Sequence, residues 1–139
     1  MPRKRRIHLT KLEGDVMRAV WDAGPAPTRV RDVLERLNAR RTRKLAYNTV
    51  QTMLTILKDK RVVQLAPGAG RAHYYRARVS RAEVSRDMVG DLAQRLFNGR
   101  VQPLLQQLID DADLSPEALA ALRDWVDEKL RDKDAEDGA

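Results

Sequence analysis

Residues 45–60 decide the fold, and they read LAYNTVQTMLTILKDK. Four apolar side chains recur there at i, i+3, i+4 and i+7, the spacing of one buried helix face; they are Val50, Met53, Leu54 and Leu57. Uncharged polar side chains repeat the same spacing on another face, namely Asn48, Gln51, Thr52 and Thr55. Asn and Gln can pair with an adenine edge, and a Thr methyl group can pack on thymine. We therefore expect a helix over about 47–59 whose polar face reads DNA bases; the alternative is an ordinary exposed polar face.

The elements around this helix predict a winged helix-turn-helix. A capping box of Thr10 and Glu13 opens a first amphipathic helix, which ends near Gly24. The pattern then predicts a second helix over 29–39, strands over 62–65 and 72–76, and a hairpin turn at 67–70. In such a module the third helix enters the major groove and the hairpin lies against the flanking backbone. The alternative is a small helical domain with a hairpin that has no role in binding.

Charge is distributed unevenly along the 139 residues, which carry a net charge of +7. Residues 1–79 hold 19 Lys or Arg against 6 Asp or Glu, whereas residues 80–139 hold 8 against 14. The first part therefore carries +13 and the second −6. A basic part of this size suits a polyanion, because each neutralised phosphate releases counterions. An Arg-rich, well-solvated surface is the other interpretation.

Several side chains flank the third helix and the wing where DNA phosphates would lie. The candidate phosphate contacts are Arg41, Arg43, Lys44, Thr49, Lys58, Lys60 and Arg71. The basic arm Arg3–Arg6 either enters a neighbouring minor groove or is a solvated tail.

The acidic part predicts three further helices. A capping box of Ser80 and Glu83 opens one over about 81–97, a second follows over 101–109, and Ser115 with Pro116 opens a third that frays from about residue 132. About 60 residues bury too little apolar surface to be stable alone. We therefore expect a mainly α chain with a winged helix-turn-helix domain at 1–79 and a three-helix dimerisation domain at 80–139. The expected dimer interface comprises Val84, Met88, Leu92, Leu96, Leu104, Leu108, Leu122 and Val126; the alternative is that these side chains pack on the N-terminal domain.

Two strings resemble the penicillinase repressor (BlaI/MecI/CopY) family. Residues 9–13 (LTKLE) are similar to its first helix and residues 45–52 (LAYNTVQT) to its recognition helix. Tyr74-Tyr75 and the string at 113–115 (DLS) are similar too, so the resemblance covers about residues 9–130. It implies a dimeric winged-helix transcriptional repressor of inverted-repeat operators in promoters. In the antibiotic-responsive members a membrane sensor triggers cleavage in the dimerisation domain, which implies a regulatory protease as a partner.

The chain departs from that family at two points. It has no cysteine, so the copper sensing of members with Cys-x-Cys motifs is excluded. Gln107-Leu108 stands where antibiotic-responsive members are cleaved between Asn and Phe, which argues against the familiar proteolytic induction.

Several other function classes are not expected, because the sequence lacks the residues that they need. No nucleophile–base pair, no carboxylate pair in an apolar stretch and no phosphate-binding loop is present, so no enzyme is expected. With no cysteine and two histidines, no metal site or cofactor is expected. No apolar run approaches a membrane span of about 20 residues, so we expect a cytoplasmic protein that binds double-stranded DNA. A non-specific nucleic-acid-binding protein, architectural or RNA-associated, remains the alternative.

Overall fold

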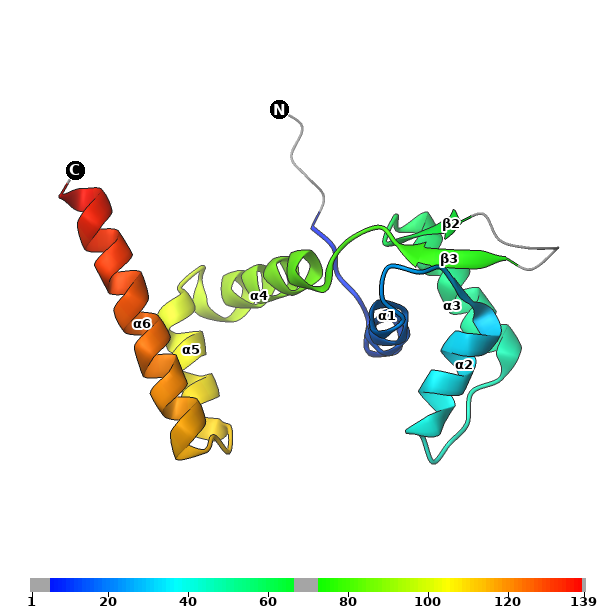
Figure 1. Ribbon diagram of the computed structural model, residues 1–139, viewed down its shortest axis with the longest axis horizontal. Coiled ribbons are helices and arrows are strands. Elements are labelled where there is room, and N and C mark those ends of the chain that lie inside the picture. Colours follow the sequence, from blue (N-terminus) through cyan, green and yellow to red (C-terminus); the bar gives the residue numbers. More distant parts are fainter. Residues whose placement is uncertain (1–5, 67–72, 139) are drawn as a thin grey trace.

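The computed structural model describes residues 6–66 and 73–138, which form six helices and one small antiparallel sheet. The helices are α1 (Lys11–Asp22), α2 (Val30–Ala39), α3 (Tyr47–Asp59), α4 (Arg81–Phe97), α5 (Val101–Asp111) and α6 (Pro116–Asp137). The strands are β1 (Thr28–Arg29), β2 (Val63–Ala66) and β3 (Tyr74–Ala77), with β3 between the other two. In Figure 1, α1, α2, α3 and the sheet gather at one end, α4 leads away from them, and α5 and α6 lie at the other end.

The helices begin at capping side chains and end at residues whose backbone conformation stops a helix. Both predicted capping boxes are present: Thr10 and Glu13 open α1, and Ser80 and Glu83 open α4. Ser115 caps α6 by accepting a hydrogen bond from the N–H of Ala118, with Pro116 in the first turn. Asn98 adopts the left-handed conformation (φ 54°) and ends α4, and Gly99 follows with φ 82°. Positive φ is sterically unfavourable for most side chains, whereas Asn and Gly tolerate it.

One aliphatic core holds α1, α2, α3 and the sheet together. Val16, Met17, Val33, Val50, Leu54, Leu57 and Val62 are all completely buried. Tyr75 of β3 joins this cluster and pairs across the sheet with Thr28 of β1 and Leu65 of β2. The order α1-β1-α2-α3-β2-β3 is that of a winged helix, so the predicted fold class is confirmed for this region.

The second region is much more open. Leu104 of α5 is buried against α4, whereas α6 has no buried residue along its 22-residue length. The first turns of α4 belong to the N-terminal core instead, because Val84 is 3% exposed there and Met88 packs against it. The domain boundary predicted at residues 79 and 80 falls at the start of α4, which contacts both regions; the two-domain division stays a prediction.

The structure differs from the sequence-based expectation in two elements. β1 was not predicted; its two residues become a strand only through pairing with β3. α6 continues to Asp137 instead of fraying near residue 132. The predicted turn at 67–70, Arg71, and residues 3–5 of the basic arm lie outside the described residues. In the described part of the chain, no helix combines the length and apolar character needed to cross a membrane.

Candidate nucleic-acid interface

The polar face of α3 is presented to solvent by the burial of its opposite face. Val50, Leu54 and Leu57 are completely buried and fix the rotation of the helix about its axis. All four predicted base-reading side chains, Asn48, Gln51, Thr52 and Thr55, are exposed. The structure therefore brings them together on one surface, as a base-reading helix requires.

The hydroxyl group of Thr55 already forms a hydrogen bond within the helix. Its hydroxyl donates a hydrogen bond to the backbone carbonyl of Gln51, with an O···O distance of 3.0 Å. Its methyl group and the lone pairs of its oxygen stay available to a ligand. Asn48, Gln51 and Thr52 make no side-chain hydrogen bond with another described residue, so their donors and acceptors are free to meet base edges.

The turn before α3 is fixed by Asn38, a residue that the sequence analysis missed. The side-chain amide of Asn38 donates to the carbonyl of Leu45 at 3.1 Å, and its oxygen accepts from the N–H of Leu45 at 2.8 Å. Lys44 also bonds the backbone carbonyl of Asn38. Asn38 thus holds the entry to α3 at both backbone groups of one residue. An Asn near the end of a helix and just before a basic turn is the signal that could have identified it.

The predicted phosphate contacts have different surroundings. Arg43, Lys44, Thr49 and Lys58 are exposed around α3. The guanidinium of Arg41 instead lies 3.8 Å from the carboxylate of Asp15, and its Nε donates to the carbonyl of Arg43. The wing contributes exposed His73 and Arg76, and Arg71 is outside the described residues. Exposed basic side chains therefore lie in the turn before α3, on α3 itself and on β3.

Lys60 has a structural partner that its sequence position did not reveal. Its ammonium lies 2.8 Å from the carboxylate of Glu13, which is 2% exposed, and it also donates to the carbonyl of His8. Burial raises the pKa of the Glu13 carboxyl, but hydrogen bonds from Lys60 and Thr10 outweigh it, so the pKa lies below its usual value. Lys60 thereby ties the end of α3 to the start of α1, and a phosphate contact from it stays a prediction.

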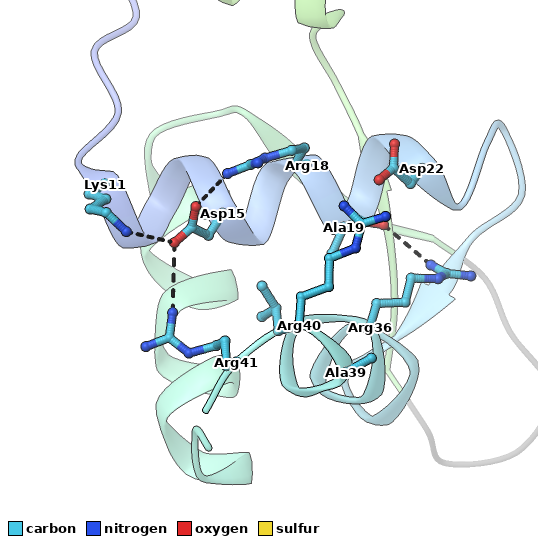
Figure 2. A pocket seen from close by; sticks show the side chains of 10 residues that line it. Lys11, Asp15, Arg18, Ala19, Asp22, Arg36, Ala39, Arg40 and Arg41 are labelled. Atoms are coloured by element: carbon cyan, nitrogen blue, oxygen red, sulfur yellow. Dashed lines mark hydrogen bonds and ion pairs between the residues drawn. The ribbon is translucent and has the colours of Figure 1, made fainter. Parts of the chain in front are cut away.

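A hollow of about 480 Å³ lies between α1 and α2 (Figure 2). Its charged lining consists of Lys11, Arg18, Arg36, Arg40 and Arg41 with Asp15 and Asp22. Asp15 receives three cations: Arg18 at 2.6 Å, Lys11 at 3.6 Å and Arg41 at 3.8 Å. Figure 2 shows these side chains converging on Asp15 from α1 and from the turn after α2. The charged side chains that line the hollow therefore form an ion-pair network on Asp15. Through Arg41, this network ties the turn that leads to α3 to α1.

The side chains predicted for the dimer interface differ in their burial within one chain. Val84 and Leu104 are buried within the chain and Met88 packs against the N-terminal core, so the alternative of packing on that domain describes the first turns of α4. The other predicted side chains are exposed: Leu92, Leu96, Leu108, Leu122 and Val126. Further apolar side chains of the same three helices are exposed as well, namely Val89, Val101, Leu105, Ile109, Leu119, Trp125 and Leu130. An apolar groove of about 460 Å³ between α4 and α5 joins Leu92, Leu96 and Leu108.

Comparison with known proteins identifies one family. The model described as penicillinase repressor matches residues 9–128. A zinc-responsive MarR family member, ZitR of Lactococcus lactis, is 12% identical with a TM-score of 0.40, over 93% of this chain and 79% of that chain. The Hop2-Mnd1 complex of Giardia lamblia is 15% identical with a TM-score of 0.36, over 91% and 80%. A search of curated proteins gave no significant match. The two structural likenesses are too weak to carry an argument, and the family match alone identifies the chain.

Proposed function

The chain belongs to the penicillinase repressor family and is a DNA-binding transcriptional repressor, not an enzyme; from this premise we propose that it acts in the cytoplasm as a homodimer on inverted-repeat operators. The observation that carries the proposal is the geometry of α3. One face of that helix packs into the core, and the opposite face exposes a stripe of uncharged hydrogen-bonding side chains.

Base recognition is proposed for Asn48, Gln51, Thr52 and Thr55. Asn and Gln can each form two hydrogen bonds with adenine, and Thr55 can offer its methyl group to thymine because its hydroxyl proton is used within the helix. Phosphate contacts are proposed for Arg43, Lys44, Thr49 and Lys58, which are exposed around the same face, with Arg41, Lys60 and Arg71 as further candidates. These contacts would position the module without selecting a sequence.

The homodimer is proposed from the distal helices. Leu108 is 56% exposed and Val126 is 48% exposed, and similar side chains continue along α5 and α6. Many exposed apolar side chains on neighbouring helices are typical of a protein interface. A two-fold dimer would place one α3 in each half of an inverted repeat, because symmetric operators mirror symmetric proteins.

A regulatory protease is not part of the proposal. Gln107 and Leu108 lie within α5, where the resemblance would place a cleaved bond. Backbone that is hydrogen-bonded in a helix is a poor protease substrate unless it first unfolds locally, and the residues themselves depart from the cleaved Asn-Phe pair.

A binding experiment with the full chain tests this function. Sites are first selected from a random duplex library, and the affinity for the best inverted repeat is compared with that for a scrambled duplex at the same salt concentration. Specific repressors bind their operators at least about 10³-fold more tightly than unrelated DNA. A ratio near one would support the non-specific alternative, in which the +13 charge of residues 1–79 accounts for all of the binding.

A further inference from the structure

The first two turns of α4 are attached to the winged-helix module at three points. At the first point Arg81 donates from Nη2 to the carboxylate of Asp22 at 3.0 Å, and its guanidinium lies 5.5 Å from the ring centroid of Trp21. At the second, Val84 is 3% exposed in the module core. At the third, Asp87 accepts a hydrogen bond from the backbone N–H of Ile7 at 3.0 Å.

The attachment reaches α1 from both of its ends. Trp21 and Asp22 are the last residues of α1, whereas Ile7 belongs to the segment that precedes it. The indole N–H of Trp21 also donates to the carbonyl of Val79 at 3.0 Å, which holds the chain just before α4. Two anchors at opposite ends of one helix resist rotation of α4 about the module better than a single contact would.

The same segment is connected to the end of α3. Ile7 binds α4 through Asp87, and the next residue, His8, accepts a hydrogen bond from the ammonium of Lys60 at 3.4 Å. Lys60 directly follows α3 and is held by buried Glu13 of α1. A short series of bonds therefore runs from α4 through the N-terminal segment to the helix that carries the polar face.

From these contacts we propose that Arg81 and Asp87 are specificity-determining residues that set the distance between the two half-sites of the operator. The inference rests on the proposed function, because it needs a dimer that binds an inverted repeat. Figure 1 shows α4 spanning the gap between the module and the distal helices. Its angle to the module consequently fixes where each α3 lies relative to the two-fold axis.

The length of α4 amplifies small changes at the anchors. Arg81 and Asp87 lie about 9 Å apart along α4, and Phe97 lies about 15 Å beyond Asp87, at about 1.5 Å per residue. If α4 pivots at Arg81, a displacement of about 1 Å at Asp87 becomes roughly 3 Å at the far end of α4, by the ratio of these lengths. Two-fold symmetry doubles the displacement, and the sum exceeds the step of about 3.4 Å between base pairs.

The ion pair of Arg81 contributes little to the stability of the module. Arg81 and Asp22 are each 56% exposed, and exposed ion pairs have small net energies. Replacing Arg81 and Asp87 leaves every side chain of the core cluster in place, Val84 included, so the module should stay folded while its angle to α4 loosens. Spacing selectivity is a property that a purely stabilising contact would not change.

The test measures spacing selectivity with the full chain. Duplexes carry the two selected half-sites separated by the best spacer or by one base pair more or fewer. We expect the unmodified protein to lose about tenfold in affinity when the spacer changes, because the reading helices then miss both the distance and the rotation of the groove. The double variant Arg81→Ala/Asp87→Ala should lose no more than about threefold, with unchanged affinity for a single half-site.

Two controls make the result decisive. Arg86→Ala removes one cation from an exposed position of the same helix and should keep the spacing selectivity of the unmodified protein. Asp87→Asn keeps an oxygen acceptor for the N–H of Ile7 and should also keep the spacing selectivity of the unmodified protein. The inference is overturned if the double variant discriminates spacers as strongly as the unmodified protein, or if Asp87→Asn loses selectivity as fully as the double variant. If the unmodified protein does not prefer an inverted repeat to a scrambled duplex, the proposed function itself fails at that earlier step.

Discussion

The winged-helix module and the distal helices use the same sequence pattern with opposite results. In the module the apolar faces of α1, α2 and α3 meet one another, and Leu54 and Leu57 are completely buried. In α5 and α6 the corresponding side chains stay exposed, as Leu108 and Leu122 show. The comparison teaches that helical periodicity tells which face is apolar, whereas the covering partner depends on the rest of the chain or on another chain.

The largest effect should come from the core of the module. Leu54→Ala removes a completely buried side chain and should lower the free energy of unfolding by about 2–5 kcal/mol. Leu119→Ala in α6, where the side chain is 43% exposed, should leave the free energy of unfolding of the module unchanged. Urea unfolding followed by the fluorescence of Trp21 and Trp125 measures both. Equal losses from the two variants would remove the contrast between the regions.

The next effect concerns association. Leu108→Asp should convert the dimer into a monomer, because an unpaired charge in an apolar interface is strongly disfavoured. The module should stay folded, since Leu108 is 56% exposed within one chain. Light scattering gives the mass, and Gln106→Asp, an equal charge at an exposed neighbouring position, is the control. A monomeric unmodified protein, or a dimer that persists in Leu108→Asp, would contradict the proposed role of the distal helices.

A smaller effect should separate the two regions by charge. Lys58→Ala should weaken binding to all duplexes alike and flatten the salt dependence by about 0.9 for each phosphate that is no longer neutralised, twice that in a dimer. Lys133→Ala in α6 removes the same charge from the other region and should change neither quantity. Fluorescence anisotropy at several salt concentrations compares them, and equal slopes for both variants would show that Lys58 does not touch a phosphate.

The smallest effect should appear on acidification. The pKa of Glu13 is lowered in the folded protein, so its carboxylate stabilises the fold above its unfolded pKa, and this contribution disappears as pH falls through the folded value. Glu13→Gln should therefore be less stable than the unmodified protein at neutral pH, with the difference shrinking toward acidic pH. Thermal melts at several pH values provide the comparison. A difference independent of pH would show that the ion pair with Lys60 has no part in stability.

Local chemistry made much of the module predictable. The capping boxes at Thr10 and Ser80 and the periodicity around Leu54 placed α1, α3 and α4 correctly, because these signals lie within one or two turns of chain. β1 escaped prediction because pairing between Thr28 and Tyr75 joins residues far apart in sequence. α6 was predicted too short because its last residues lack apolar side chains, although Glu, Lys and Ala have good helix propensity.

The candidate site was predictable in part. The polar face of α3 follows from spacing alone, so Asn48 and Gln51 were found. The partners of Lys60 and Arg41 were not, because Glu13 and Asp15 approach them from another helix. Val84 was predicted to lie in the dimer interface because its place on an apolar helix face can be read from neighbouring residues. Its burial against the module depends on residues far away in the sequence.

Whether α3 reads DNA sequence is best tested by comparing two proteins on two kinds of operator. Affinities are measured for the unmodified protein and for Gln51→Ala, each on the selected operator and on operators with one base pair changed in both half-sites. We expect the unmodified protein to discriminate each change by roughly 1–3 kcal/mol, and Gln51→Ala to lose this discrimination at one base pair while keeping it elsewhere. If Gln51→Ala weakens binding equally on every operator and keeps every base preference, α3 does not read the sequence through Gln51.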